Sequence, residues 1–374
     1  RFYVWTWEEL ERVLNPIDLL EISRVFSLKK EGNLPIGVLE HLPKGNIFYR
    51  TEEWQEIGKD KGISPVEMQQ KIEKVLPVLF QVRSSRVRPR KDTKILADWN
   101  GLMVAALAYG GRVLGDTEYT AAAERAADFV MTRMQKSDGR LHHVYATETA
   151  YIDAFTEDYA AMAWGEIELY QTTFQPIHLK RAISLMDQLN QWYWDKERGG
   201  YYLTASDGEA LIAHKKEVYD GAIPSGNSLA MYALLRLARL TGIIEYEDRA
   251  IRLWRALSGQ LDEIPQGSTF LQLATDYFFG PAQEVVIVGD PASPDTREMV
   301  QEIRTSFHPH MTVHLLSGGE SDVELKEIVP STRAYAPPGQ KMAVYICSGD
   351  RCLGPTAEIE TVRAYLSLHP NNIK

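Results

Sequence analysis

The chain has 374 residues, of which 44% are hydrophobic and 25% are charged, a composition typical of a globular protein with a sizeable core. Its 51 acidic and 41 basic residues give a formal net charge of −10, the wrong sign for binding the phosphate backbone of nucleic acids. The sequence contains neither an apolar stretch of about 18 residues nor an N-terminal secretion signal, so we expect a cytoplasmic protein that does not span a membrane.

A helix is predicted over residues 65–84, and a repeat of two unlike helices follows it three times. In the first copy, residues 102–111 carry no charge, which indicates a buried helix, and residues 118–134 form an amphipathic partner. The second copy starts at residue 157 and turns at 173–176, and the third starts at 224–227 and turns at 241–242. A further apolar helix is predicted over 269–279.

The connections of this repeat alternate in length. The turn from an apolar to an amphipathic helix has a few residues, which makes the two helices antiparallel neighbours. The returning connections are long, include strand-like pieces at 139–145 and 199–204, and are of the kind that carries function. Several such hairpins around one axis predict a mainly α fold, an (α/α)6 toroid with the apolar helices inside.

The pattern changes after residue 280. A β-branched run over 284–288 precedes a helix over 295–307, a strand over 312–316 and a third strand over 342–347, which together predict a small parallel α/β piece. The last helix, over about 356–368, is expected to complete the ring. We therefore expect a toroid over 1–280, an α/β insertion over 281–352 and a C-terminal helix over 353–374.

Because the inner helices run parallel, their N-terminal ends share one face, and that face gathers acidic and aromatic residues. Carboxyl groups beside aromatic rings suit sugars, since one carboxyl can donate a proton, another can act as base or nucleophile, and rings stack on sugar faces. The candidate catalytic residues are Asp98, Asp158, Asp220 and His142, and the candidate substrate-binding residues are Trp99, Asn100, Glu157, Tyr159, Ser225 and Asn227.

Each of these residues also has a purely structural interpretation. Asp98, Asp158 and either Ser225 or Asn227 stand where helix N-caps stand, and a cap needs no function. Trp99 begins an apolar helix and is better explained by core packing. His142 and His143 alternate along a strand, so at most one of them faces the cleft. An epimerase would need one of these two with His214 opposite.

Other chemistries are not supported by motifs. Ser225 lacks the spacing of a nucleophile elbow, and the strand ending at Gly289 is not followed by a phosphate-binding glycine pattern, so we expect no nucleotide and no other cofactor. Cys347 and Cys352 could form a disulfide or bind a soft metal, but without two further ligands nearby we expect no metal site and interpret them as free thiols.

Five segments carry a resemblance to a known family: FYVWT at 2–6, SSRVRP at 84–89 with ILADWNGLM at 95–103, DGAIPSGNS at 220–228, VVIVGDP at 285–291, and YIC at 345–347 with Cys352. Together they resemble the spermatogenesis-associated protein 20 family of thioredoxin-domain-containing proteins. The resemblance implies an N-terminal thioredoxin-like domain followed by a six-hairpin toroid similar to six-hairpin glycosidases and N-acylglucosamine 2-epimerases. This chain, which begins at Arg1, would be the second part, and it contains no C-x-x-C motif.

Two hypotheses follow. The first is a domain that binds or processes carbohydrate, as a hydrolase or an epimerase, at the acidic face of the ring. The second is a domain without catalysis that binds clients or partners for an attached thioredoxin-like redox module.

Overall fold

The computed structural model describes residues 2–34, 44–59, 62–209, 211–305, 307–335, 342–349 and 351–367. The chain divides into two compact units, Arg1–Asp92 and Thr93–Lys374. Among the described residues, no helix is long and apolar enough to cross a membrane.

The first unit has its own small hydrophobic core. Leu10 of α1 (Trp7–Val13), Ile22 of α2 (Pro16–Val25) and Ile72 of α4 (Pro65–Ser84) pack together in it. The α4 helix has the predicted bounds and begins at a capping box between Ser64 and Glu67. The remaining elements are α3 (Trp54–Lys59) and the antiparallel pair β1 (Trp5–Thr6) and β2 (Gly45–Asn46). The expected boundaries include none near residue 92, where this core ends.

The second unit contains the predicted helical hairpins in the predicted order. Inner helices alternate with amphipathic outer helices, and left-handed residues such as Gly115, Phe174 and Gly242 end the inner ones. The three hairpins are α5 (Ala97–Leu114) with α6 (Thr117–Phe129), α7 (Thr156–Thr173) with α8 (Pro176–Trp192), and α9 (Gly226–Thr241) with α10 (Ile244–Leu257). A π-helical turn, Val130–Met134, extends α6, and α11 (Gly259–Glu263) and a 3-10 turn, Pro265–Gly267, lead to α12 (Thr269–Phe279).

Glycines bring the N-terminal ends of the inner helices together. A Cβ on Gly101 of α5 would lie 2.5 Å from the backbone of Ala161 in α7, and one on Gly226 of α9 would lie 2.9 Å from the Glu157 nitrogen. Gly165 makes a second close approach of α7 to α5. Since backbones this close exclude any side chain, the starts of α5, α7 and α9 are held side by side and parallel.

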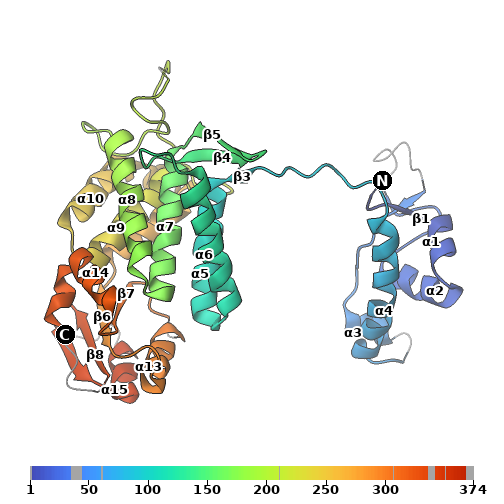
Figure 1. Ribbon diagram of the computed structural model, residues 1–374. Coiled ribbons are helices and arrows are strands. Elements are labelled where there is room, and N and C mark those ends of the chain that lie inside the picture. Colours follow the sequence, from blue (N-terminus) through green and yellow to red (C-terminus); the bar gives the residue numbers. More distant parts are fainter. Residues whose placement is uncertain are drawn as a thin grey trace. The chain divides into compact units, whose positions relative to one another are not determined.

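The long connection after the first hairpin and the residues just before α5 form a small antiparallel sheet at this end of the helices (Figure 1). Its strands, in spatial order, are β3 (Ile95–Leu96), β4 (His142–Ala146) and β5 (Thr149–Asp153). β4 confirms the first strand-like piece of the sequence. The second, at 199–204, is wrong, because only an isolated bridge pairs Tyr201 with Trp194 there.

At the opposite end of the helices lies an α/β part (Figure 1). Its sheet has the order β7-β6-β8-β9, in which β6 and β7 are parallel, as predicted, and the other pairs are antiparallel. The elements are β6 (Gln283–Val288), α13 (Pro294–Thr305), β7 (Met311–Leu316), α14 (Glu320–Ile328), the 3-10 turn Pro330–Ala334, β8 (Ala343–Ser348), β9 (Arg351–Thr356) and α15 (Ile359–Ser367).

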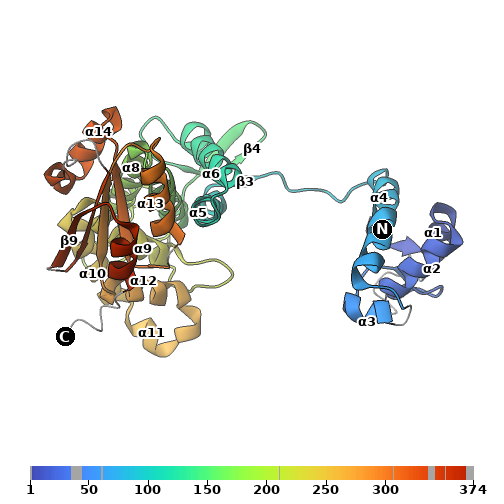
Figure 2. The same ribbon diagram turned by 90° about the horizontal axis from the view of Figure 1, so that it is seen from below.

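Two features of this α/β part differ from the predictions made from the sequence. The helix expected to complete the ring, α15, packs beside α13 and β9 (Figure 2). Its Val362 joins the hydrophobic core of the sheet. Cys347 and Cys352 form a disulfide, so the expectation of free thiols is wrong. The reason is register: the two cysteines face each other across β8 and β9, with their Cα atoms 4.1 Å apart. The mainly α fold of toroid-type helical hairpins with a small α/β part is confirmed.

Candidate functional site

Asp98, His143 and Asp158 come together where α5 and α7 begin. The Nδ1 atom of His143 lies 2.9 and 3.0 Å from the two carboxylate oxygens of Asp158, which is fully buried. Asp158 also accepts hydrogen bonds from the backbone N–H groups of Asp98 and Phe155, at 2.9 and 2.7 Å. The bond from the Phe155 N–H, at the N-cap of α7, is the Asp158 half of a capping box, because phenylalanine has no side-chain acceptor to complete it. Both of its oxygens are therefore engaged, and it orients the imidazole ring.

Asp98 is buried inside the first turn of α5 and is not the N-cap that the sequence suggested, a position taken by Leu96. One of its oxygens accepts the Trp99 N–H at 2.8 Å, and its other oxygen has no hydrogen-bond partner in the described part of the chain. Burial and the neighbouring Asp158 charge raise the pKa of the Asp98 carboxyl. The hydrogen bond to Asp158 raises the pKa of His143, although burial opposes it. Asp98 is thus a base candidate and His143 a donor through Nε2.

Glu157 adds a third carboxyl group to this pair of acids. Burial, reinforced by the charges of Asp158 and Asp98, raises the pKa of Glu157 to about 7. Its Oε2 atom is buried and, among the described residues, has no hydrogen-bond partner. The Glu157 charge also acts on His143. Glu157 therefore lies beside the Asp98–His143–Asp158 cluster and holds a proton near neutral pH.

By spacing alone, the cluster could also hold a metal ion. One ligand atom each from Asp98, His143 and Asp158 can be chosen so that all lie within 4.8 Å of one another. Asp158, however, already accepts two backbone N–H groups and the imidazole. These hydrogen bonds favour a carboxylate–histidine pair over a set of metal ligands.

The histidine in this cluster is His143, whereas the sequence analysis had selected its neighbour His142. His142 points to the other side of β4, where its Nδ1 lies 3.9 Å from Asp153. His214, the partner considered for an epimerase, is exposed and packs its ring on Tyr202. The strict alternation of side chains along a strand explains why only one of the two adjacent histidines reaches Asp158.

The third predicted acid, Asp220, lies elsewhere in the unit and binds backbone. It accepts the N–H groups of Ser225, Phe270 and Leu271 at 2.8 to 3.0 Å, which ties the start of α12 to the loop before α9. Ser225 is the N-cap of α9, with its hydroxyl accepting from the Ser228 N–H. These contacts explain the unusual composition of this stretch.

Asn227 also bridges loops. Its side chain bonds both backbone groups of Tyr201 and the carbonyl of Glu217. Tyr159 is fully buried and accepts the Leu141 N–H, and Asn100 donates to the Leu96 carbonyl. The predicted binding residues Ser225, Asn227, Tyr159 and Asn100 are thus engaged with backbone groups.

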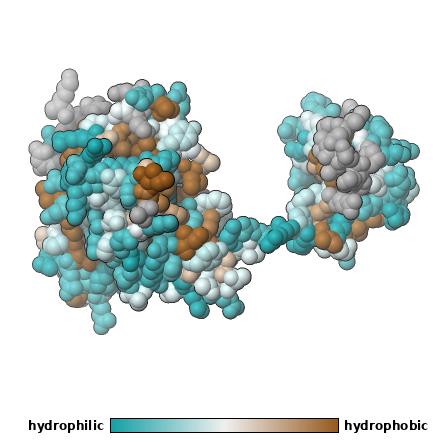
Figure 3. Space-filling view, turned by 90° about the horizontal axis from the view of Figure 1, so that it is seen from above, coloured by the Kyte–Doolittle hydropathy of each residue, from teal (hydrophilic) through white to brown (hydrophobic). Residues whose placement is uncertain are grey.

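Trp99 contradicts its expected place in the core, because 60% of its surface is exposed. It follows Asp98 at the start of α5, where the helix leaves the packed interior. Figure 3 views this end of the unit and shows apolar patches among hydrophilic ones. An exposed indole beside buried acids is available to stack on a ligand.

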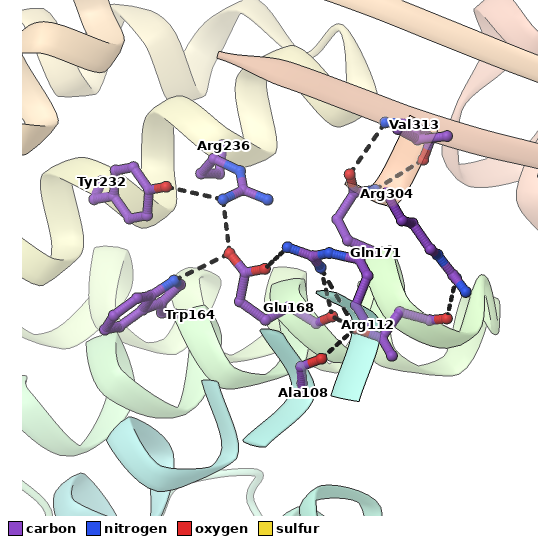
Figure 4. Close-up of polar contacts among 10 residues, drawn as sticks. Ala108, Arg112, Trp164, Glu168, Gln171, Tyr232, Arg236, Arg304 and Val313 are labelled. Atoms are coloured by element: carbon purple, nitrogen blue, oxygen red, sulfur yellow. Dashed lines mark hydrogen bonds and ion pairs between the residues drawn. The ribbon is translucent and has the colours of Figure 1, made fainter. Parts of the chain in front are cut away.

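A second polar cluster, which the sequence did not predict, lies in the C-terminal halves of the inner helices (Figure 4). Glu168 accepts hydrogen bonds from Arg236 at 2.7 Å, Arg112 at 2.8 Å and the Trp164 indole at 3.2 Å. Burial alone would raise the pKa of Glu168, but the two arginines outweigh it and lower the pKa to about 2. The signal in the sequence was the occurrence of Glu168 and Arg236 on otherwise apolar helices.

Comparison with known proteins connects this chain to one group of relatives. No protein-family model matches the sequence. Human spermatogenesis-associated protein 20 is 27% identical over 393 aligned positions, which cover 99% of this chain and 49% of that protein. The rat protein of the same name is also 27% identical, over 95% of this chain and 48% of its own length. Over nearly its whole length, the chain is therefore similar to part of the protein named spermatogenesis-associated protein 20 in human and rat. It spans about half the length of these relatives.

Among solved structures, partial similarity is found to a family GH76 α-mannanase of Bacteroides thetaiotaomicron, with 14% identity and a TM-score of 0.40 over 52% of this chain and 56% of that chain. A cellobiose 2-epimerase of Bacillus thermoamylovorans gives 17% identity and a TM-score of 0.38 over 44% and 45%.

Proposed function

We propose that the second unit binds and processes carbohydrate at the N-terminal ends of α5 and α7. One observation carries the proposal: Asp98, Glu157 and the Asp158–His143 pair converge there, next to the exposed Trp99 ring. Neighbouring acids with unequal proton affinities are what acid–base chemistry on a neutral polyol requires.

Glu157 is the general acid, because it holds its proton near neutral pH and one of its oxygens has no protein partner among the described residues. In a hydrolytic reaction, its proton would pass to the glycosidic oxygen as that bond breaks. Asp98, with one oxygen free of hydrogen bonds to the described residues, would act as base or nucleophile. His143, held by Asp158, would donate from Nε2 to a sugar hydroxyl, and in an epimerase it would instead carry the second proton transfer.

The test is a glycan array followed by chromatography of di- and trisaccharides of glucose, mannose and galactose incubated with the chain. We expect binding by the wild type and a new hydrolysed or epimerised product. Glu157→Gln should retain binding but form no product, and Glu327→Gln, an exposed change on α14, should behave as wild type. Absence of any bound sugar, or product formation by Glu157→Gln at the wild-type rate, would contradict the proposal.

A second candidate is supported by a different observation. Asp158 and Asp220 direct their oxygens to backbone N–H groups, as structural acids do. A domain without catalysis could then bind clients for a thioredoxin-like domain located N-terminally in the full-length protein. This candidate requires that a full-length protein reduce client disulfides equally well with Glu157→Gln and Asp98→Asn, and that no sugar bind.

A further inference from the structure

A separate cavity of about 590 Å³ lies between the C-terminal halves of the inner helices and the α/β part. Its walls come from α5, α7, α9 and α12 on one side and from α13 and residues 307–311 on the other. It lies toward the opposite end of the inner helices from the Asp98–His143 site, because those residues are at the starts of α5 and α7 and the cavity is lined from Ala105 and Trp164 onward. Its volume falls within the range of small-molecule sites, about 300 to 1,000 Å³.

The acids in the cavity wall are already paired. Glu168 is shared by Arg112 and Arg236, and Asp276 lies 2.8 Å from His310. Arg304 of α13 also lines the cavity, and in the described part of the chain it has no acidic partner. The wall therefore carries a positive charge that the protein does not neutralise.

The contacts of Arg304 leave part of its guanidinium unsatisfied. It donates to the carbonyl of Thr172 and lies over the ring of Phe174, 5.0 Å from the ring centre. Its Nε atom is buried without a hydrogen-bond partner among the described residues, and so is the Nε of Arg236, whose side chain is 5% exposed. Burial, with the nearby charge of Arg112, lowers the pKa of Arg304 to about 10, so it stays charged at neutral pH. Arg304 is half-buried, and a partly desolvated cation without an anion is costly, a cost that a bound anion would reduce.

The rest of the wall is apolar and aromatic. Tyr109 and Phe307 line the cavity and are 46% and 81% exposed, whereas Trp164 and Tyr232 are packed on the core. Exposed rings beside the half-buried Arg304 provide a surface for the apolar body of a ligand and a positive charge for an anionic group. The planar guanidinium matches the two oxygens of a carboxylate.

We propose that this cavity binds a small organic carboxylate with an aromatic body, whose carboxylate pairs with Arg304 and whose ring lies against Phe174 and Phe307. The ligand is a free small molecule, and it is bound independently of the sugar site. Its affinity depends mainly on one charge-assisted pair, so loss of either charge should weaken binding by about tenfold or more.

Isothermal titration of the full chain with 3-phenylpropanoate and with its neutral analogue 3-phenylpropanamide tests the proposal. We expect the wild type to bind the carboxylate at least about tenfold more tightly than the amide, a preference that Arg304→Gln reduces to about twofold or less. The control Arg255→Gln removes the same charge from the exposed surface of α10 and should keep the preference.

Arg304→Lys controls for loss of folding in Arg304→Gln, because lysine keeps the positive charge and lacks only the planar guanidinium group. It should retain part of the preference and melt at the wild-type temperature. Three results would overturn the proposal: no binding of 3-phenylpropanoate at millimolar concentration, equal affinity for acid and amide, or an undiminished preference in a folded Arg304→Gln chain.

Discussion

Glu157→Gln should make the protein more stable at neutral and alkaline pH. The pKa of Glu157 is raised from 4.5 to about 7 in the folded chain, mainly by burial. Between these two values the unfolded chain has released the proton and the folded chain still binds it. Stability therefore falls as pH rises through this interval, because the native state binds more protons than the unfolded state. The glutamine side chain has nearly the same shape and never ionises, so the variant escapes this loss.

The expected size follows from the same interval. At about 1.4 kcal/mol per pH unit, the wild type loses up to about 3 kcal/mol between pH 4.5 and pH 7 relative to the variant. Urea unfolding of the full chain, followed by tryptophan fluorescence at several pH values from 4 to 9, measures the difference. Wild type and variant share the unit Arg1–Asp92, so its unfolding cancels, and the difference reports on residue 157 together with its charge effect on His143.

The change of this stability difference with pH tests whether the Glu157 carboxyl is buried and protonated in the folded chain. The gain in unfolding free energy should be near zero at pH 4, grow through pH 5 and 6, and level off above pH 7. Glu327→Gln, an exposed change of the same kind, should show no such growth. A gain that does not depend on pH, or a variant less stable than the wild type at pH 8, would refute the reasoning that the carboxyl is buried and protonated.

Three further outcomes are expected from thermal or urea unfolding. Glu168→Gln should cost about 3 to 5 kcal/mol, because it leaves Arg236 buried without its carboxylate partner. Gly101→Ala should cost about 2 kcal/mol or more by forcing α5 and α7 apart, whereas Gly110→Ala, which meets nothing closer than 3.8 Å in the same helix, should stabilise by about 0.5 to 1 kcal/mol. Reduction of the Cys347–Cys352 disulfide should cost at most about 2 kcal/mol, because the loop it closes is short. Costs below 1 kcal/mol for the first two changes, a destabilising Gly110→Ala, or a much larger cost of reduction would contradict these accounts.

The hairpins could be predicted because their signal is local. Inner helices are largely apolar, with a charge-free stretch at 102–111, whereas the outer helices are amphipathic, and the glycines at 115 and 242 mark the ends of two inner helices. The first unit was not separated from the helical hairpins because its core joins residues far apart in the sequence, such as Leu10 and Ile72. The disulfide was missed for a similar reason, since it depends on the register of β8 and β9. A sequence lists both cysteines but does not state which residues oppose each other.

At the candidate site, the sequence predicted which face the acids share but not what each of them does. Asp98, Glu157 and Asp158 do meet there, because parallel inner helices place their starts together. Asp220 is also an acid near the start of an inner helix, in the loop before α9, yet it binds three backbone N–H groups. Asp220 differs from the acids of the candidate site in the direction of its side chain, and that direction depends on packing between elements.

In the second unit, acidic residues lie at the N-terminal ends of the parallel inner helices and arginines lie toward their C-terminal ends. The aligned dipoles of these helices favour negative groups at the N-terminal ends and positive groups at the C-terminal ends. Asp98 and Glu157 occupy the first turns of α5 and α7, and Arg112 the last turn of α5. At the acidic end, the protein itself supplies the negative groups, so a neutral polyol suits that site better than an anion. At the other end, Arg304 adds a cation from outside the ring that no acid of the described wall neutralises, and there an anion is the better complement. The two proposed ligands thus differ in charge for the same physical reason, the common direction of the inner helices.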